Sequence, residues 1–416
     1  MLFRSNAYFR WSRAASHAFE RRGSVGEMYT STRVTRSLRR SVERGGFLRE
    51  IDWVLASAVL LLLFIGALLV SASTRDWYAA QGLDPHGYLK KQIINIVIGL
   101  ILAVLITVVD YRLLRAYTPI LWGLAVIGLI LVMIPGIGST INGARAWIVL
   151  PGGLSIQPAE FAKLAIIIGM AMLLAERRDA EKDPRHIDVL LALGVAALPV
   201  LLIFLQPDIG SILIVSCAVV AIVAVSGAPA RWIAGLLLIG VLGGVVAVKA
   251  NILHDYQLKR LQSFVNPSAD PLESGYQLQQ ARITIGSGGY FGKGLYHGPQ
   301  SNGRFVPEQQ TDFIFTVAGE ELGFFGTGLI IALFGIVLWR AGRIARRTHD
   351  LFGRLVATGV MAWFAFQTFE NIGMAMGLMP MTGVPLPFLS SGGTSLFATL
   401  MGVGLLQNVY ARRSWN

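Results

Sequence analysis

The stretch DWVLASAVLLLLFIGALLVSA, residues 52–72, decides the fold class of this chain. Its only charged residue, Asp52, stands at its first position, and about 20 mostly apolar residues are what a helix needs to cross a lipid bilayer. Nine further apolar segments follow, near residues 92–109, 118–135, 159–175, 188–205, 209–226, 232–250, 313–339, 355–377 and 389–410. The sequence therefore predicts an all-α integral membrane protein of about ten transmembrane helices.

The composition of the whole chain agrees with this prediction. Of its 416 residues, 54% are hydrophobic and 14% are charged, whereas soluble proteins carry about 25% charged residues. A net charge of +12 would suit a nucleic-acid partner only if the basic residues shared a solvated face. Here they stand between apolar runs, so we expect no nucleic-acid partner. The single cysteine, Cys217, lies in an apolar segment and excludes an intrachain disulfide.

The positions of Lys and Arg predict the orientation of the helices, because positive residues are retained on the cytoplasmic side. Most of the 36 Lys and Arg residues lie in the Arg-rich segment 1–50 and in every second connection after it. We therefore expect both termini in the cytoplasm, with residues 1–50 forming a flexible tail against anionic lipid and residues 51–416 forming the membrane domain. The tail has no apolar core like that of a cleavable signal, so the first transmembrane helix would direct insertion.

The longest connection, residues 251–312 between the seventh and eighth predicted helices, then faces outward. A connection of this length is usually functional or disordered. Its aromatic and aliphatic content is higher than disordered segments show, which favours an ordered loop with short interfacial or re-entrant helices. The residues that carry this content are Tyr256, Phe264, Tyr276, Ile283, Ile285, Tyr290, Phe291, Tyr296 and Phe305.

Within this loop, Asp270 allows two interpretations. It precedes Pro271, and an Asp before Pro is most often a turn or helix-cap residue. A carboxylate near Arg260 and Arg282 at the membrane face can also serve as a general base. The residues by themselves favour the turn.

The glycine-rich strip from Gly286 to Gly294 resembles a phosphate-binding loop only superficially. A Walker A motif would need Gly at position 287 and Ser or Thr at position 294, where this chain has Ser287 and Gly294. Backbone N–H groups of such a strip, with Lys293 as a point charge, can still contact a pyrophosphate. A hinge in the loop explains the glycines equally well.

Three polar sites lie at the ends of predicted helices. Glu160 and Lys163 follow Pro158 at a helix start and are either a local i,i+3 ion pair or residues that face a wet cavity. Asp208, after Pro207, is interpreted as a helix cap, as is Asp312. Glu320 and Glu321 lie further along a predicted helix and need partners.

The last unusual segment contains Pro380, Pro385 and Pro387, which forbid a continuous helix. Broken backbone at the membrane edge is tolerated where it is buried in protein or lines a cavity. Such a break fits a substrate groove, and it also fits a transporter.

Taken together, these motifs resemble the SEDS family (shape, elongation, division and sporulation), which includes RodA and FtsW. The resemblance runs over about residues 52–411. It rests on the order of Gly143-Ala-Arg145-Ala-Trp147, Gln157-Pro-Ala-Glu160-Phe-Ala-Lys163, Gln206-Pro-Asp208-Ile-Gly, Asn266-Pro-Ser-Ala-Asp270-Pro, Gly275-Tyr-Gln277, Ile285-Gly-Ser-Gly-Gly, Gly292-Lys-Gly294, Pro307-Glu308, Thr311-Asp-Phe-Ile-Phe, Gly319-Glu-Glu-Leu-Gly323 and Pro385-Leu-Pro.

The resemblance implies a peptidoglycan glycosyltransferase that polymerises lipid II at the outer face of the bacterial plasma membrane, with inversion at the anomeric carbon. It implies that Asp270 is the catalytic carboxylate, which reverses the preference for a turn, and that a class B penicillin-binding protein is the partner. The segment from Gly383 to Pro387 is more similar to the elongation-type branch than to the division-type branch. The substrate-binding residues would be Lys293, Arg260, Arg282, Arg145, Trp147, Glu160, Lys163 and Gln277.

Several alternatives stay open. A lipid II flippase or other transporter would also have ten helices, buried charges and a broken helix, and a non-catalytic scaffold would recruit a crosslinking enzyme. A division-type septal polymerase is a further alternative. A divalent cation, Mg²⁺ or Mn²⁺, is compatible with the chemistry, although the sequence shows no ligand motif for one.

Overall fold

The computed structural model describes residues 50–141, 144–149, 155–176, 183–250, 255–266 and 274–412. Within these ranges a long helix lies at each of the ten predicted segments, which confirms the all-α prediction. The helices are α2 (Trp53–Ala80), α3 (Gly87–Val108), α4 (Tyr111–Leu131), α5 (Pro158–Glu176), α6 (His186–Leu205), α7 (Ile209–Val225), α8 (Ala230–Lys249), α12 (Ile314–Arg347), α13 (Leu351–Met376) and α14 (Gly393–Arg412).

The surface of the bundle is apolar, as a lipid environment requires. Over the described ranges, seven of the helices are long and apolar enough to cross a membrane, and α7, with 17 residues, is a shorter apolar helix. Helix α8 has no buried residue and exposes side chains such as Leu238 and Ile239. An apolar face of this extent is stable against lipid rather than against water.

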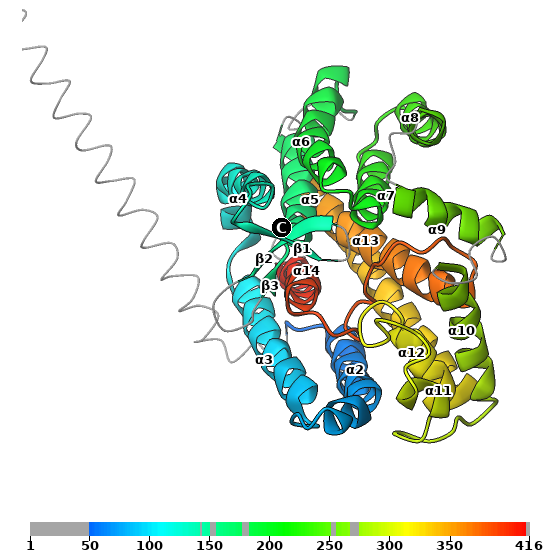
Figure 1. The fold of residues 1–416 in the computed structure, drawn as a ribbon. Coiled ribbons are helices and arrows are strands. Elements are labelled where there is room, and N and C mark those ends of the chain that lie inside the picture. The colour runs from blue at the N-terminus through cyan, green and yellow to red at the C-terminus, as the bar shows by residue number, and fades with distance from the viewer. Residues whose placement is uncertain are drawn as a thin grey trace, which may run out of the picture. The chain divides into compact units, whose positions relative to one another are not determined.

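The interior of the bundle is built around α5, α13 and α14, with α8 at the edge (Figure 1). Helix α13 buries Trp363 and Phe364, and small residues let its neighbours approach. A Cβ added at Gly359 would lie 2.7 Å from Ile167 on α5, and one at Gly402 of α14 would lie 2.9 Å from Phe364. Such close contacts between helices are typical of membrane proteins, where packing replaces the hydrophobic driving force.

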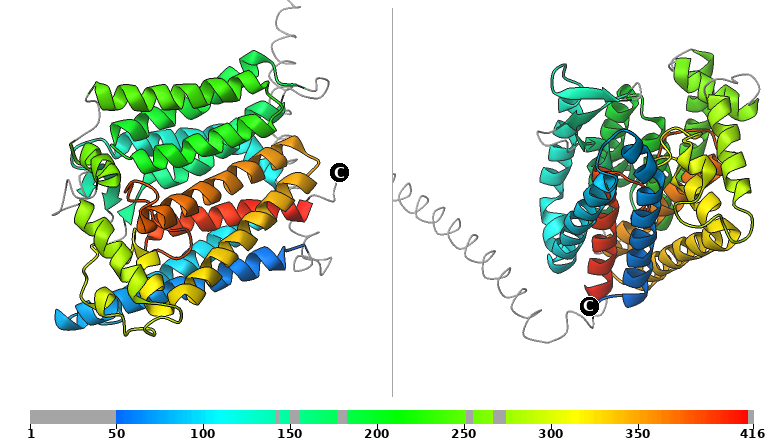
Figure 2. Two further views of the ribbon diagram at one scale, coloured as in Figure 1. Left: turned by 90° about the vertical axis from the view of Figure 1, so that its right-hand side faces the viewer. Right: turned by 60° about the horizontal axis from the view of Figure 1, so that its bottom comes forward.

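The connection 251–312 contains the expected short helices. They are α9 (Asp255–Val265), α10 (Ser274–Ser287) and α11 (Pro299–Asn302), and they gather at the end of the bundle away from the end of α14 (Figure 2, left). The prediction of short helices in this loop is confirmed within the residues that the structure describes.

A small antiparallel sheet was not predicted. It comprises β1 (Gly138–Ile141), β2 (Ala144–Val149) and β3 (Ser155–Ile156), in the order β1-β2-β3. Its register is irregular, since Ser139 pairs with Trp147 and Thr140 with Arg145, which leaves Ala146 as an extra residue. A bulge of this kind redirects side chains, and here it accompanies the burial of Ala146. Strands of two to six residues leave too short a period to be recognised in a sequence.

Helix α12 is broken at Gly323, whose φ of 67° and ψ of −163° are not helical. The glycine-rich strip pairs with this break: the Lys293 N–H donates to the Glu320 carbonyl (2.9 Å), and the Phe324 N–H donates to the Gly289 carbonyl (2.9 Å). The backbone groups that the break removes from the helix are therefore satisfied. The interpretation of Asp312 as the cap of this helix is wrong, because α12 begins after Phe313 and has no side-chain cap.

Candidate functional site

A cavity of about 490 Å³ lies where the ends of α3, α5, α7, α9 and α14 meet β2 and the broken segment 380–392. Residues from both ends of the chain contribute to it, so no single motif encodes it. Four carboxylates and two cations are among its lining residues in the described part of the chain: Glu160, Asp208, Glu308, Asp312, Lys91 and Arg260. The cavity is thus polar and charged inside an apolar bundle.

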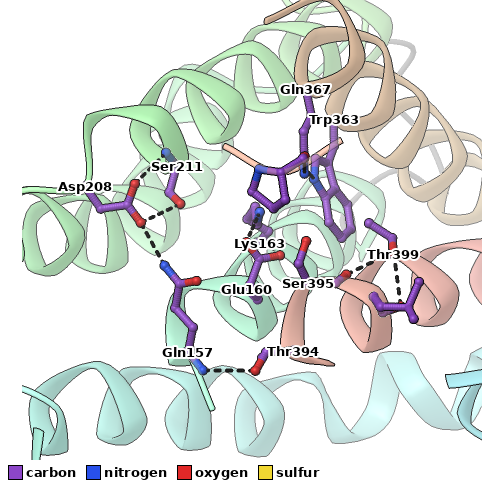
Figure 3. Close-up of polar contacts among 12 residues, drawn as sticks. Gln157, Glu160, Lys163, Asp208, Ser211, Trp363, Gln367, Thr394, Ser395 and Thr399 are labelled. Atoms are coloured by element: carbon purple, nitrogen blue, oxygen red, sulfur yellow. Dashed lines mark hydrogen bonds and ion pairs between the residues drawn. The ribbon is translucent and has the colours of Figure 1, made fainter. Parts of the chain in front are cut away.

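Glu160 and Lys163 form a buried ion pair of 2.8 Å between Oε1 and Nζ, as Figure 3 shows. Helix α5 begins at Pro158, so Glu160 stands in the first turn at the cavity and Lys163 stands one turn deeper. The Lys163 ammonium also lies over the Trp363 ring, 5.1 Å from its centroid. The predicted ion pair is confirmed. The other Glu160 oxygen, Oε2, has no hydrogen-bond partner among the described residues, which leaves an acceptor at the cavity wall.

Asp208 is the N-cap of α7, as predicted. Its Oδ1 accepts from the Ser211 N–H (3.0 Å), and its Oδ2 accepts from the Ser211 hydroxyl (2.8 Å) and from Gln157 Nε2 (3.1 Å). The same carboxylate lines the cavity. Asp208 therefore caps α7 and also lines the cavity. The interpretation as a helix cap gave only the first of these two roles.

Asp312 and Arg260 both lie close to Gly383. A Cβ added at Gly383 would lie 3.4 Å from Asp312 Oδ2 and 3.6 Å from Arg260 Nη1. Burial raises the pKa of Asp312 to about 6, the negative charge of Glu308 adds to this rise, and the positive charge of Arg260 opposes it. Asp312 thus carries a carboxylate whose charge changes close to neutral pH.

The broken segment 380–392 is held in place by polar residues of α13. Gln367 Nε2 donates to the Pro385 carbonyl (2.8 Å), and Asn371 Nδ2 donates to the carbonyls of Val384 and Asp312 (2.7 Å each). Since Pro385 and Val384 line the cavity, the prediction that the break lines a cavity is confirmed. Fixed backbone of this kind suits a binding site because it costs no ordering when a ligand arrives.

The structure brings together three of the predicted site residues and separates others. Trp147, Glu160 and Arg260 line the cavity, and Lys163 supports Glu160 from behind. The remaining residues do not line it: Arg145 and Lys293 are exposed, Gln277 is half-buried in α10, and Arg282 donates from Nη2 to the Gly377 carbonyl (3.1 Å). Asp270 lies outside the described residues.

Sequence reasoning missed the wall that α3 forms. Tyr88, Lys91, Gln92 and Asn95 all line the cavity, and their spacing of three, one and three residues places them on one face of the helix. This polar stripe on an apolar helix was a usable signal, because polar residues at helical spacing within a membrane span mark a wet interior.

Within the ranges that the structure describes, no three His, Cys, Asp or Glu side chains are placed to hold a metal ion together.

Comparison with known proteins identifies relatives over nearly the whole membrane domain. The family model for FtsW, RodA and SpoVE, described as cell cycle protein, matches residues 52–414. Stage V sporulation protein E of Bacillus subtilis (strain 168) is 41% identical over 86% of this chain and 96% of its own length. The peptidoglycan glycosyltransferase MrdB of Escherichia coli (strain K12) is 35% identical over 85% of this chain and 93% of its own length.

Two solved structures are similar in fold. A chain from a structure titled "Structural coordination of polymerization and crosslinking by a peptidoglycan synthase complex" gives a TM-score of 0.72 at 33% identity, over 88% of this chain and 99% of that one. The Rod shape determining protein RodA of Thermus thermophilus gives 0.64 at 31% identity, over 88% and 98% of the two chains. The helical membrane fold is therefore shared with these proteins.

Proposed function

This chain belongs to the SEDS family of peptidoglycan glycosyltransferases, the FtsW, RodA and SpoVE proteins, and on that premise we propose that it polymerises lipid II into glycan strands at the outer face of the plasma membrane. The observation that carries the proposal is that segment 251–312 supplies Arg260, Glu308 and Asp312 to the same cavity as the membrane helices. A lipid-linked substrate needs a site formed by both the loop and the membrane helices, because its lipid tail lies in the bilayer and its sugar reacts at the membrane surface.

The proposed reaction is a single displacement. Asp270 takes the proton from the 4-hydroxyl of the acceptor sugar while that oxygen attacks the anomeric carbon of the donor. The bond from this carbon to the pyrophosphate oxygen breaks, and the lipid pyrophosphate leaves with the electron pair. Attack opposite to the leaving group inverts the anomeric carbon. Positive groups at the leaving pyrophosphate lower the barrier because negative charge grows there.

The test is polymerisation by the purified chain, with lipid II and Mg²⁺ or Mn²⁺, alone and with a class B penicillin-binding protein as the proposed partner. We expect glycan polymer from the wild type and none from Asp270→Asn, which keeps the shape of the side chain and removes its basicity. Asp84→Asn is the matched control, since Asp84 is exposed and pairs with Lys90 (2.6 Å) outside the cavity. Gel analysis of labelled product gives the readout.

Two results would contradict the proposal. Polymer from Asp270→Asn at the wild-type rate would remove Asp270 from the chemistry. Absence of polymer from the wild type even with the partner, together with scrambling of labelled lipid II in vesicles, would identify a transporter instead.

Within the family, we propose the elongation-type role. Its support is the segment Gly383-Val-Pro385-Leu-Pro387, whereas the named relatives include sporulation, division and elongation proteins. Expression in rod-shaped cells depleted of their elongation-type polymerase should restore rod shape. Rescue of septation in cells depleted of the division-type polymerase, without rescue of rod shape, would assign the division role.

A further inference from the structure

Four aromatic side chains gather on the surface at the break in α12. Tyr290 and Phe291 belong to the glycine-rich strip, and Phe324 and Phe325 directly follow the break. All four are between 59% and 83% exposed. The ring centroids of Tyr290 and Phe324 are 6.3 Å apart, and those of Phe291 and Phe325 are 5.2 Å apart. These four residues are called the aromatic patch below.

The backbone holds the aromatic patch together. The Phe324 N–H donates to the Gly289 carbonyl (2.9 Å), and the Phe325 N–H donates to the Tyr290 carbonyl (3.1 Å). Two segments that are distant in sequence thus present their rings side by side. Each exposed ring loses free energy in water in proportion to its apolar area, and contiguous patches of this kind usually have a partner. The aromatic patch therefore calls for an apolar environment.

The burial of α12 changes at the break. Every residue from Ile314 to Glu321, before the break, is buried in the protein. After it, exposed apolar side chains recur along one face of the helix, since Phe325, Leu329 and Ile336 are four and then seven residues apart. The aromatic patch is thus the outermost part of the apolar face that α12 presents to lipid.

The length of α12 places the aromatic patch at a membrane surface. Arg346 and Arg347, in the last turn of the helix, are exposed and mark one surface. Phe324 stands 22 residues before Arg346, which corresponds to about 33 Å along the helix axis. A typical tilt of about 20° reduces this distance to about 31 Å, and the hydrocarbon core of a bilayer is about 30 Å thick. The patch therefore lies at the opposite surface, which the Lys and Arg distribution predicts to be the outer one.

We propose that the aromatic patch is immersed in the outer leaflet, at the boundary between the acyl chains and the headgroups, with Lys293 at the level of the lipid phosphates. Aromatic rings are favoured at this boundary, and an exposed lysine beside them places its charge among the headgroups. Lys293 is exposed in the same strip. The glycine-rich strip then fixes the height of the outer connection above the bilayer. The inference does not depend on the reaction, because neither the patch nor Lys293 is among the described residues that line the cavity.

The test measures the depth of nitroxide labels on the full chain in vesicles of phosphatidylethanolamine and phosphatidylglycerol. Single cysteines are introduced in a Cys217→Ala background, and collisions with O₂, which enters lipid, are compared with collisions with a water-soluble Ni²⁺ chelate. Labels at Phe291→Cys and Phe325→Cys should lie about 5–10 Å below the headgroup boundary. A label at Leu329→Cys should lie about 6 Å deeper than the one at Phe325→Cys, because four helical residues span that length. Asp84→Cys, at an exposed position in a connection, is the water control.

Lys293 is tested in the same vesicles. A label at Lys293→Cys should be shallower than the label at Phe291→Cys and less accessible to the Ni²⁺ chelate than the label at Asp84→Cys. A label at Lys293→Cys that is deeper than the one at Phe291→Cys would contradict the assignment of Lys293 to the phosphates. Melting temperatures equal to that of the Cys217→Ala background are expected for all these variants, since the replaced side chains are exposed.

Two results would overturn the membrane assignment of the patch. Collision of the Ni²⁺ chelate with labels at Phe291→Cys and Phe325→Cys as frequent as at Asp84→Cys would place the patch in water. Protection of both labels from O₂ and from the Ni²⁺ chelate would place the patch against protein, either a second copy of the chain or an added class B penicillin-binding protein. Polymerisation of lipid II is measured separately, so labels in lipid on a chain that makes no polymer would support this inference and contradict only the proposed function.

Discussion

At the residue scale, the carboxylates of the cavity differ in how their charge is stabilised. Asp208 accepts three hydrogen bonds from Ser211 and Gln157, and Glu160 is neutralised by Lys163. Removing Lys163 alone would leave a buried uncompensated charge, which costs several kcal/mol. Among the residues that the structure describes, none forms such an ion pair with Asp312, and its pKa rises to about 6 through burial and the negative charge of Glu308.

This raised pKa predicts how Asp312 affects stability with pH. Between the ordinary value of 3.8 and about 6, the folded state binds more protons than the unfolded state, so the stability from the protonated group is lost as pH rises through 6. Asp312→Asn removes the buried charge and should raise the melting temperature at pH 8. At pH 5, inside this range, the difference should be smaller, and it should nearly vanish below about pH 3.8, where Asp312 is protonated in both the folded and the unfolded chain.

The control is Asp84→Asn. Lys90 and the His86 N–H lower the pKa of Asp84, so the fold favours the ionised form of this side chain. Asp84→Asn should therefore not raise the melting temperature at pH 8. A gain in melting temperature for Asp312→Asn that is equal at pH 5 and pH 8 would show that packing, rather than charge, explains the effect.

At the element scale, the break in α12 shows how a glycine determines the path of a helix. The φ of Gly323 is 67°, and a Cβ added there would lie 2.2 Å from the Gly292 backbone nitrogen. A side chain would therefore meet both backbone strain and a clash with the glycine-rich strip. The strip thus has a structural explanation, because its N–H and carbonyl groups bond the backbone of the break.

We therefore expect Gly323→Ala to destabilise the fold by about 1–3 kcal/mol or more, which is the usual cost of a disallowed backbone conformation. Gly328 lies in the same helix with nothing within 4 Å of an added Cβ, so Gly328→Ala should be neutral or stabilise by up to about 1 kcal/mol. Thermal melts of both variants in the same detergent provide the comparison. Equal melting temperatures for the two variants would show that the break tolerates a side chain.

At the scale of the whole molecule, the two ends of the membrane domain lie on one side. The Asp52 N–H donates to Gln407 Oε1 (2.9 Å), and Gln407 Nε2 donates to the Asp52 carbonyl (3.0 Å). Arg340, near the end of α12, forms an ion pair with Asp52. This placement agrees with termini that share one compartment, and the choice of the cytoplasm rests on the Lys and Arg distribution. Residues 1–49 lie outside the described residues, so the cytoplasmic tail stays a prediction.

Labelling of single cysteines tests the orientation. In a Cys217→Ala background, Asp84→Cys in the connection between α2 and α3 should react with a membrane-impermeant maleimide in intact cells. His349→Cys, between α12 and α13, should react only after the membrane is permeabilised. Both positions are exposed, so access to the reagent is the only variable. The reverse pattern would place the termini outside and would exclude a reaction at the outer face.

The ten helices and some of the local contacts at their ends, such as the Asp208 cap, could be predicted from the sequence alone, whereas the predicted Asp312 cap was wrong. A transmembrane helix must be apolar over its own length. A helix cap, or an i,i+3 pair such as Glu160 and Lys163, joins residues that are close in the chain. All of these features therefore appear as local patterns in the sequence. The composition of the cavity could not be predicted in this way. Lys91, Glu160, Arg260 and Gly393 are far apart in sequence and meet only through the packing of helices.

The same distinction explains which site residues were predicted and which were not. Lys293 and Arg282 have the positive charge that a substrate anion would need. In the fold, however, the Lys293 backbone bonds the broken α12, and the Arg282 side chain bonds the end of α13. Lys91 and Lys90 are adjacent in the sequence and carry the same charge. Only the tertiary structure shows that Lys91 lines the cavity and that Lys90 pairs with Asp84. The sequence by itself thus determined that this chain is a helical membrane protein with motifs of its family. The tertiary structure decided which of its charges share a cavity, because electrostatic interactions depend on distance in space and not on distance along the chain.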